Sequence, residues 1–341
     1  MTSQDSTPAG GKLQKSSPAM GKIALVRLRD LALLPALVVL VIIGSLVSPV
    51  FLNPNNLNTI LTSSAALALI VLAESLIIIT GKFDLSLESV YGFAPAIGAM
   101  VVVPAAKFGF GLEWPTFVGI IVVLLVGGAV GFINGFLVVM LRLNAFIVTL
   151  AMLIILRGML VGATSGRTLF DLPDAFYGLM EITLLGLPLA VWLAALAFLI
   201  AGLVLRYHRL GRALYAIGGN PEAARAAGIR VERVVWGVYV LAGVLAALGG
   251  LAITGYVGAI SANQGNGLIF TVFAAAVIGG ISLDGGKGTM FGALTGVLLL
   301  GVVQNVLTLA QVPSFWIQAI YGAIILGSLM VARFAGGQVQ Q

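Results

Sequence analysis

Charged and amide side chains inside long apolar stretches are the residues of this chain that could do chemistry. The candidates are Glu74, Glu88, Asn134, Arg157, Gln304 and Asn305. A charged group at the centre of a bilayer costs about 2.5–3.5 kcal/mol on insertion scales, so each is a candidate for a solute pathway. Structural roles also remain open. Arg157 could reach the membrane surface, Glu88 could lie at a solvated helix start, and Glu74 could form a simple buried pair. The amides could join neighbouring helices.

Sequence motifs for enzymatic chemistry are missing from this chain. The segment 284–289 superficially resembles a nucleotide-binding phosphate loop, but Ile281 stands where the first glycine should be and Gly288 replaces the residue that would bind magnesium. The chain has no Cys, and His208 is its single His, which excludes a metal site built from these residues. We therefore expect no enzyme activity and no cofactor. Any ATP and magnesium that the protein uses must be bound by a partner subunit.

Long apolar segments determine the fold class. Of the 341 residues, 60% are hydrophobic and 9% are charged, and the apolar runs are continuous rather than alternating. This pattern excludes a soluble domain, argues against a β-barrel, and predicts an all-α, polytopic helical membrane protein. About ten transmembrane helices are expected, at residues 31–50, 58–80, 86–104, 116–141, 144–164, 187–205, 234–256, 268–283, 288–309 and 315–333.

The basic residues fall on one side of these spans. With the N-terminus in the cytoplasm, every Lys and Arg except Lys107, Arg157 and Arg167 is cytoplasmic, as the positive-inside rule requires. The membrane therefore explains the net charge of +6 and the pI near 9.8, and nucleic acid is not an expected partner. Both termini are expected in the cytoplasm. Residues 1–28 should be a disordered tail, 29–335 the transmembrane domain and 336–341 a C-terminal tail.

Glycine patterns predict close helix packing. Two sets of three glycines each share one helix face at four-residue spacing: Gly127, Gly131 and Gly135, and Gly288, Gly292 and Gly296. Such faces favour packing seams, and a sliding surface for a conformational change is the alternative. The segments 81–86 and 280–288 are weakly similar, so an internal duplication and chance similarity both remain open.

The longest hydrophilic segment between spans, residues 206–233, contains a complete helix signal. Asn220 is a good N-cap and Pro221 suits the first helical position. Glu222 suits the positive end of the helix dipole, and Gly228 can take the left-handed conformation that ends a helix. A short capped helix outside the bilayer, on the cytoplasmic side, predicts a surface that contacts a partner.

From about residue 55 to 333, the chain resembles the permease subunit of ribose-type sugar importers of the ATP-binding-cassette class. The matching stretches are Ile79-Thr80-Gly81-Lys82-Phe83-Asp84-Leu85-Ser86, Asn134-Gly135, Phe146-Ile147-Val148-Thr149-Leu150 with Arg157-Gly158, residues 211–220 and 223–225 with Gly228-Ile229, and residues 279–283 with 285–288. Each stretch alone is a weak signal, and their combination is specific.

This resemblance implies transport of a sugar, in particular a monosaccharide, into the cytoplasm across the bacterial inner membrane. The implied partners are a cytoplasmic ATP-binding-cassette ATPase, a second permease copy or close paralogue, and a periplasmic or surface-tethered substrate-binding protein. The capped helix would be the coupling helix that docks into a groove on the ATPase, where Arg212 and Arg225 could pair with acidic groups. The residues expected at this contact are Arg212, Gly219, Asn220, Pro221, Glu222, Ala223, Ala224, Arg225 and Gly228.

The start of the third span departs from the family pattern. The family usually has Gly-Ile-Asp-Leu-Ser-Val-Gly there, whereas here Lys82-Phe83 precedes Asp84 and Leu87-Glu88 follows Ser86. A carboxylate in place of the usual small residue could change the substrate route. Asp84 and Ser86 therefore join the pathway candidates.

Two alternatives to sugar import remain. A permease of the same class could transport nucleosides or branched-chain amino acids. An ion-coupled secondary transporter would instead need Glu74 or Glu88 as the group that binds and releases a proton.

Overall fold

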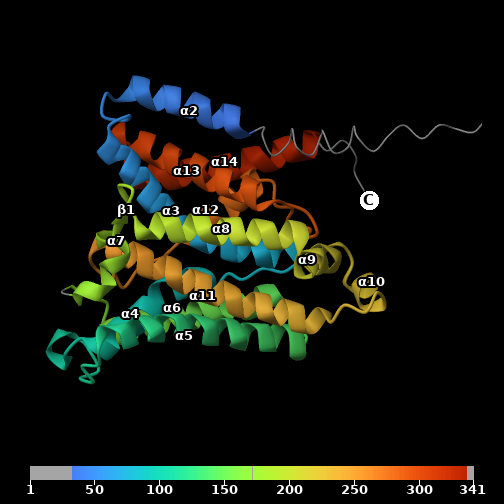
Figure 1. Ribbon diagram of the computed structural model, residues 1–341, viewed down its shortest axis with the longest axis horizontal. Helices are drawn as coiled ribbons and strands as arrows, with labels where there is room; N and C mark the ends of the chain where they lie inside the picture. The colour runs from blue at the N-terminus through green and yellow to red at the C-terminus, as the bar shows by residue number, and fades with distance from the viewer. Residues whose placement is uncertain (1–32, 171, 336–341) are drawn as a thin grey trace, which may run out of the picture.

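The computed structural model describes residues 33–170 and 172–335, and the described chain folds as a bundle of long helices (Figure 1). The predicted tails, 1–28 and 336–341, lie outside the described residues. In chain order the elements are α2 (Leu33–Val47), α3 (Pro54–Ile79), α4 (Leu87–Val102), the 3-10 turn η1 (Ala105–Lys107), α5 (Thr116–Gly135), the π-helical turn η2 (Phe136–Met140), α6 (Ala145–Thr164), the 3-10 turn η3 (Asp174–Phe176), α7 (Gly178–Glu181), β1 (Thr183–Leu184), β2 (Leu187–Pro188), α8 (Leu189–Tyr207), α9 (Arg209–Gly219), α10 (Pro221–Ala226), α11 (Val231–Val257), α12 (Leu268–Ile278), α13 (Met290–Leu309) and α14 (Ser314–Ala335).

The apolar helices match the predicted spans. In the described part of the chain, six of them are long and apolar enough to cross a membrane: α3, α5 with η2, α6, α8, α11 and α13. The helices α2, α4 and α12 are shorter, and α14 occupies the last predicted span. The largest boundary error is at α12, which was predicted to reach residue 283. It ends at Ile278 because Gly280 takes the left-handed conformation, with φ 82°.

Close helix packing at glycine confirms the first predicted seam and, of the second, Gly292 and Gly296; Gly288 was wrongly included, since it lies before α13 with φ 138°. The helix α11 packs against both α3 and α5. A side chain at Gly131 would overlap the carbonyl oxygen of Tyr239 on α11. At the second seam, a side chain at Gly292 on α13 would overlap the carbonyl oxygen of Gly279, and one at Gly296 would overlap that of Ala275 on α12. These positions must be glycine because the backbones touch.

Two of the helices begin part-way through the apolar layer. With 11 residues, α12 is about 16 Å long at 1.5 Å per residue, roughly half of the ~30 Å hydrocarbon core. The segment 80–86 turns back along α3, because the Asp84 N–H donates a 3.2 Å hydrogen bond to Glu74. Since Glu74 lies five residues before the end of α3, the segment that leads into α4 reaches about 7.5 Å inside that end at Asp84.

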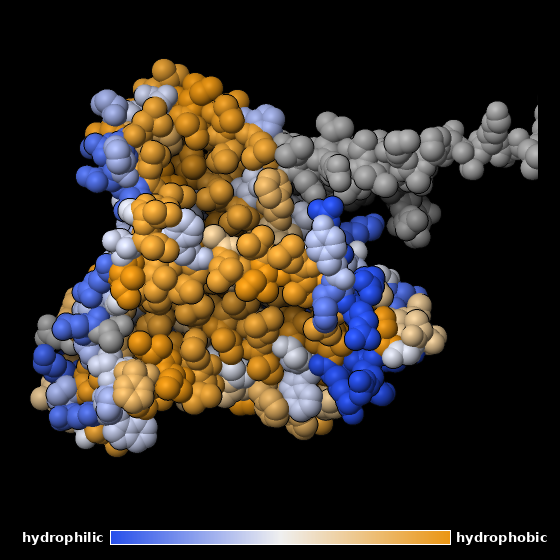
Figure 2. Space-filling view, viewed as in Figure 1, coloured by the Kyte–Doolittle hydropathy of each residue, from blue (hydrophilic) through white to orange (hydrophobic). Residues whose placement is uncertain are grey.

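The bundle has an apolar middle and two polar ends (Figure 2). One end holds α9 and α10 together with the basic side chains Lys82, Arg142 and Arg225. The positive-inside rule makes this basic end cytoplasmic. The opposite, outer end holds α7 and the β1–β2 hairpin.

Candidate functional site

The helix α10 has the capping predicted from the sequence. The side-chain oxygen of Asn220 accepts hydrogen bonds of 3.0 Å from the N–H groups of both Glu222 and Ala223. Pro221 occupies the first helical position, and Gly228 closes the turn with φ 82°. The expected helix therefore forms, although it is only six residues long.

Almost every residue of α10 is exposed. From Pro221 to Gly228 every residue is exposed except Ala224, which packs into the core. Arg225 is not available as a free cation, since its Nε donates a 2.9 Å hydrogen bond to Glu232. The Arg212 guanidinium donates to the carbonyl oxygen of Tyr207 at 3.2 Å. The predicted pairing of these arginines with a partner stays a prediction, and it would require exchange of these internal contacts.

A second cytoplasmic helix, α9, was missed by the sequence reasoning. His208 caps it by accepting a 3.2 Å hydrogen bond at Nδ1 from the N–H of Leu210. Leu214 and Ile217 are buried on its inner face. The three-residue spacing of these two apolar residues after a capping His was the signal in the sequence that indicates this helix.

Four glycines join α9 to the membrane domain. A side chain at Gly218, near the end of α9, would overlap both the carbonyl oxygen of Ile79 and the amide of Gly286. A Cβ on Gly285 would lie 2.8 Å from the Cα of Gly81. The Gly286 N–H also donates a 2.9 Å hydrogen bond to Ile79. We call Gly81, Gly218, Gly285 and Gly286 the glycine junction.

The glycine junction brings together the two segments that the sequence comparison paired. Residues 81–86 follow α3 and lead into α4, and residues 280–288 follow α12 and lead into α13. Their contact does not test the duplication. It does show that α9 touches both loops at one place.

A buried polar cluster lies at the start of α4. The Asp84 carboxylate accepts hydrogen bonds from the Ser86 hydroxyl at 2.6 Å and from the Asn134 amide at 3.2 Å. Glu74 contacts the same segment through the Asp84 N–H, and its Oε2 has no hydrogen-bond partner among the described residues. All four side chains are fully buried. The structure therefore brings these four pathway candidates together as an internal framework of α3, α4 and α5.

A second polar cluster holds residues 258–267, the non-helical segment between α11 and α12. The Glu88 carboxylate accepts from the N–H groups of Gly267 at 3.3 Å and Ile269 at 3.1 Å, and so caps the start of α12. Arg157 on α6 lies 3.4 Å from Glu88 and donates to the carbonyl oxygen of Gln264 at 2.9 Å. These contacts fix the non-helical segment 258–267 among α4, α6 and α11. Gln264 was missed from the sequence because it lies in a loop between two predicted spans, and only the tertiary contacts of that loop with α4, α6 and α11 reveal its role.

The remaining candidates lie apart from both clusters. Asn305 exchanges hydrogen bonds with Asn56, at 2.8 and 3.0 Å, and thereby joins α13 to the start of α3 at the outer end. Gln304 accepts from the Tyr321 hydroxyl at 3.3 Å. These contacts match the helix-joining role that was left open for the amides.

Comparison with known proteins places the chain in a transport family. Residues 56–331 match the family model described as branched-chain amino acid transport system / permease component. The chain is 36% identical over 300 residues to the ribose import permease protein RbsC of Escherichia coli (strain K12), covering 87% of this chain and 91% of that protein.

Other relatives have different printed substrates. The L-arabinose ABC transporter permease protein AraH of Azospirillum brasilense is 31% identical over 294 residues, covering 86% of this chain and 84% of the relative. The autoinducer 2 import system permease protein LsrC of Yersinia pseudotuberculosis is 34% identical over 299 residues, covering 88% and 83%. No solved structure matches the chain. The chain therefore belongs to the branched-chain amino acid transport system / permease component family and is a multi-pass permease subunit of the bacterial inner membrane.

Proposed function

We propose that this chain is the membrane-spanning subunit of an ATP-driven importer that moves a monosaccharide into the cytoplasm. Among the relatives described above, one is a ribose import permease and another an L-arabinose permease, and each matches more than four fifths of this chain. Sugars are neutral and polar, and the apolar helices with few ionisable groups suit a route that holds such a solute weakly.

The exposed helix α10 is the observation that best supports coupling to an ATPase. It projects from the basic end of the bundle, exposes every residue except Ala224, and is joined through α9 to the glycine junction. A groove on a cytoplasmic ATPase would receive α10 at Arg212, Gly219 and the residues from Asn220 to Gly228. Nucleotide-driven motion of that groove would then move α9 and both junction loops.

ATP and magnesium would be bound by the partner ATPase. The phosphate-loop-like segment 284–289 supports this division, because Gly285 and Gly286 pack directly on the backbone of Gly81, Gly218 and Gly219. A phosphate group at this segment would have to displace these backbone contacts. A second permease copy or close paralogue and a substrate-binding protein complete the proposed assembly.

The two polar clusters would have different roles in transport. Glu88 and Arg157 would hold the non-helical segment 258–267 beside the solute route. Glu74, Asp84, Ser86 and Asn134 would position the start of α4 without touching the solute, since all are fully buried. Gln304 and Asn305 would join helices at the outer end.

Uptake measurements in whole cells would test this function. Cells that express the chain with its ATPase and binding protein should accumulate a labelled monosaccharide, with ribose and arabinose as the first substrates. Uptake should stop when ATP is depleted and should continue when a protonophore collapses the proton gradient at constant ATP. Loss of uptake with the protonophore alone would support the ion-coupled alternative.

A branched-chain amino acid is the second candidate substrate, because the matching family is described by that transport system. Competition separates the two candidates. An excess of unlabelled leucine should leave sugar uptake unchanged, whereas saturable leucine uptake that sugars do not inhibit would favour the second candidate.

A further inference from the structure

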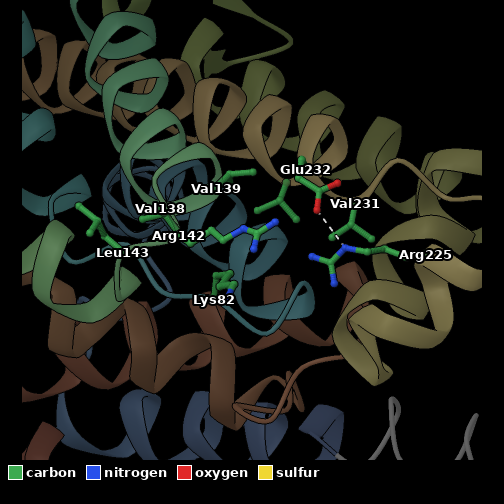
Figure 3. Close-up of a pocket in the computed structure, with 9 residues that line it drawn as sticks. Lys82, Val138, Val139, Arg142, Leu143, Arg225, Val231 and Glu232 are labelled. Atoms are coloured by element: carbon green, nitrogen blue, oxygen red, sulfur yellow. Dashed lines mark hydrogen bonds and ion pairs between the residues drawn. The ribbon is translucent and has the colours of Figure 1, made fainter.

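A basic pocket opens at the cytoplasmic edge of the bundle (Figure 3). Its volume is about 430 Å³, and its walls come from the segment after α3, the η2 turn, α10 and the start of α11. Lys82, Arg142 and Arg225 provide its positive charges and Glu232 its single negative charge. A second hollow of about 510 Å³ shares Lys82 and Arg142 and extends toward Phe146 at the start of α6.

The positive charge of this pocket is only partly compensated. Glu232 pairs with Arg225 at 2.9 Å. Among the residues that the structure describes, neither Lys82 nor Arg142 forms an ion pair. In Figure 3 the Arg142 side chain extends into the pocket toward Glu232, with Lys82 beneath it. Arg142 also has φ 56°, an uncommon conformation for a non-glycine residue, which is set by the tight turn between η2 and α6.

The rest of the wall is apolar. Val138 and Val139 come from η2, and Val231 and Val235 come from the first turns of α11. These residues belong to spans, so the cations lie where the apolar layer meets the cytoplasm. A ligand that matches both features has a negative group beside a hydrocarbon part. An acidic protein segment would pair with the cations but would leave the apolar wall of valines without an apolar partner.

We propose that the pocket binds the phosphate headgroup of an anionic phospholipid from the cytoplasmic leaflet. The phosphate would lie between Lys82 and Arg142, and the first part of an acyl chain would lie against the valines. Basic pockets between spans on the cytoplasmic side favour such headgroups. Since Arg225 and Glu232 form one wall, a bound lipid would touch the base of α10 and stabilise its position relative to the bundle.

Lipid retention by the purified full-length chain in complex with its partner subunits would test this proposal. Complexes would be reconstituted in nanodiscs that contain phosphatidylglycerol and phosphatidylcholine, extracted into mild detergent, and analysed by native mass spectrometry. Lys82→Gln and Arg142→Gln should each lower retention of phosphatidylglycerol about fivefold and leave phosphatidylcholine unchanged. Both side chains are exposed, so the variants should fold.

The matched controls are Arg209→Gln and Arg233→Gln, which remove the same charge from exposed positions outside the pocket. They should retain phosphatidylglycerol like the parent chain. Equal losses in pocket and control variants would overturn the proposal, since they would indicate general attraction to a basic face. Unchanged lipid retention with loss of the ATPase from the Lys82 and Arg142 variants would also overturn it and assign the pocket to an acidic protein segment.

Discussion

The hydroxyl of Tyr215 donates a 2.7 Å hydrogen bond to the carbonyl oxygen of Gly288. Tyr215 lies on the cytoplasmic helix α9, and Gly288 ends the loop that leads into α13. Together with the glycine junction one turn further along α9, this bond fixes the cytoplasmic helices to the membrane domain. Under the proposed coupling, motion of α10 and α9 would reach the membrane domain through these direct contacts.

Gly218→Ala should uncouple the cytoplasmic helices from the bundle. The added methyl group would overlap Ile79 and Gly286, and overpacking of this kind costs about 1–3 kcal/mol. We expect uptake to fall while the ATPase still co-purifies. Gly237→Ala is the control, because nothing lies within 4 Å of a Cβ at that position. Normal uptake by Gly218→Ala would show that the junction tolerates displacement.

Removal of the Arg157 guanidinium should loosen the packing of the non-helical segment 258–267. Arg157→Met keeps much of the side-chain length but loses the bonds to Glu88 and Gln264. The expected destabilisation is about 1.5–3 kcal/mol, at the lower end because the Arg157 side chain is 17% exposed. Thermal unfolding of the solubilised protein measures the change.

Glu88→Gln gives a more specific test of the same cluster. Glutamine keeps one oxygen that can accept from Gly267 or Ile269, but it removes the charge that faces Arg157. Its effect on the unfolding temperature should be smaller than that of Glu88→Ala. Equal effects of the two variants would mean that capping of α12 by residue 88 contributes nothing.

Asn134→Leu should destabilise the start of α4. The substitution removes the amide that donates to Asp84 and to the Ser86 hydroxyl, leaving a buried carboxylate with fewer partners. A loss of about 1–3 kcal/mol is expected from such an unsatisfied group. Asn55→Leu is the control, since Asn55 is exposed. A stable Asn134→Leu variant that lost only transport would instead favour a direct pathway role for Asn134.

Asn305→Ala tests whether the Asn305 amide joins two helices or contacts the transported solute. Loss of the paired bonds to Asn56 should cost about 1 kcal/mol of stability and leave the Michaelis constant for sugar uptake unchanged. A raised Michaelis constant in a variant of normal stability would place Asn305 on the solute route.

The sequence was most informative where structure depends on local signals. The lengths of the apolar segments predicted the spans, and the capping residue Asn220 predicted α10. Both features are determined by residues close together in the chain. The early end of α12 was missed, although the Gly279-Gly280 pair was a visible helix-ending signal.

The polar clusters could not be assembled from the sequence. Glu88 and Ile269 are 181 residues apart, and their contact requires that the chain leave helical geometry at 258–267. The eight pathway candidates were all polar residues near or inside spans, yet packing divides them among three places. Only the tertiary structure could show that Asp84 and Asn134 share a cluster that excludes Asn305.

Coupling through α10 is the central claim, and replacement of residues 221–227 by a glycine–serine linker of equal length that keeps Ala224 tests it most directly. The change leaves Gly218, Asn220 and the buried Ala224 in place, so the glycine junction and the bundle should keep their unfolding temperature. The measurement is co-purification of the ATPase with the full-length permease, with Arg233→Gln as the matched cytoplasmic control. We predict that the linker variant inserts in the membrane at the parent level and retains no ATPase, whereas the control retains it. Retention of the ATPase by the linker variant, together with ATP-dependent uptake, would contradict the assignment of α10 as the coupling helix.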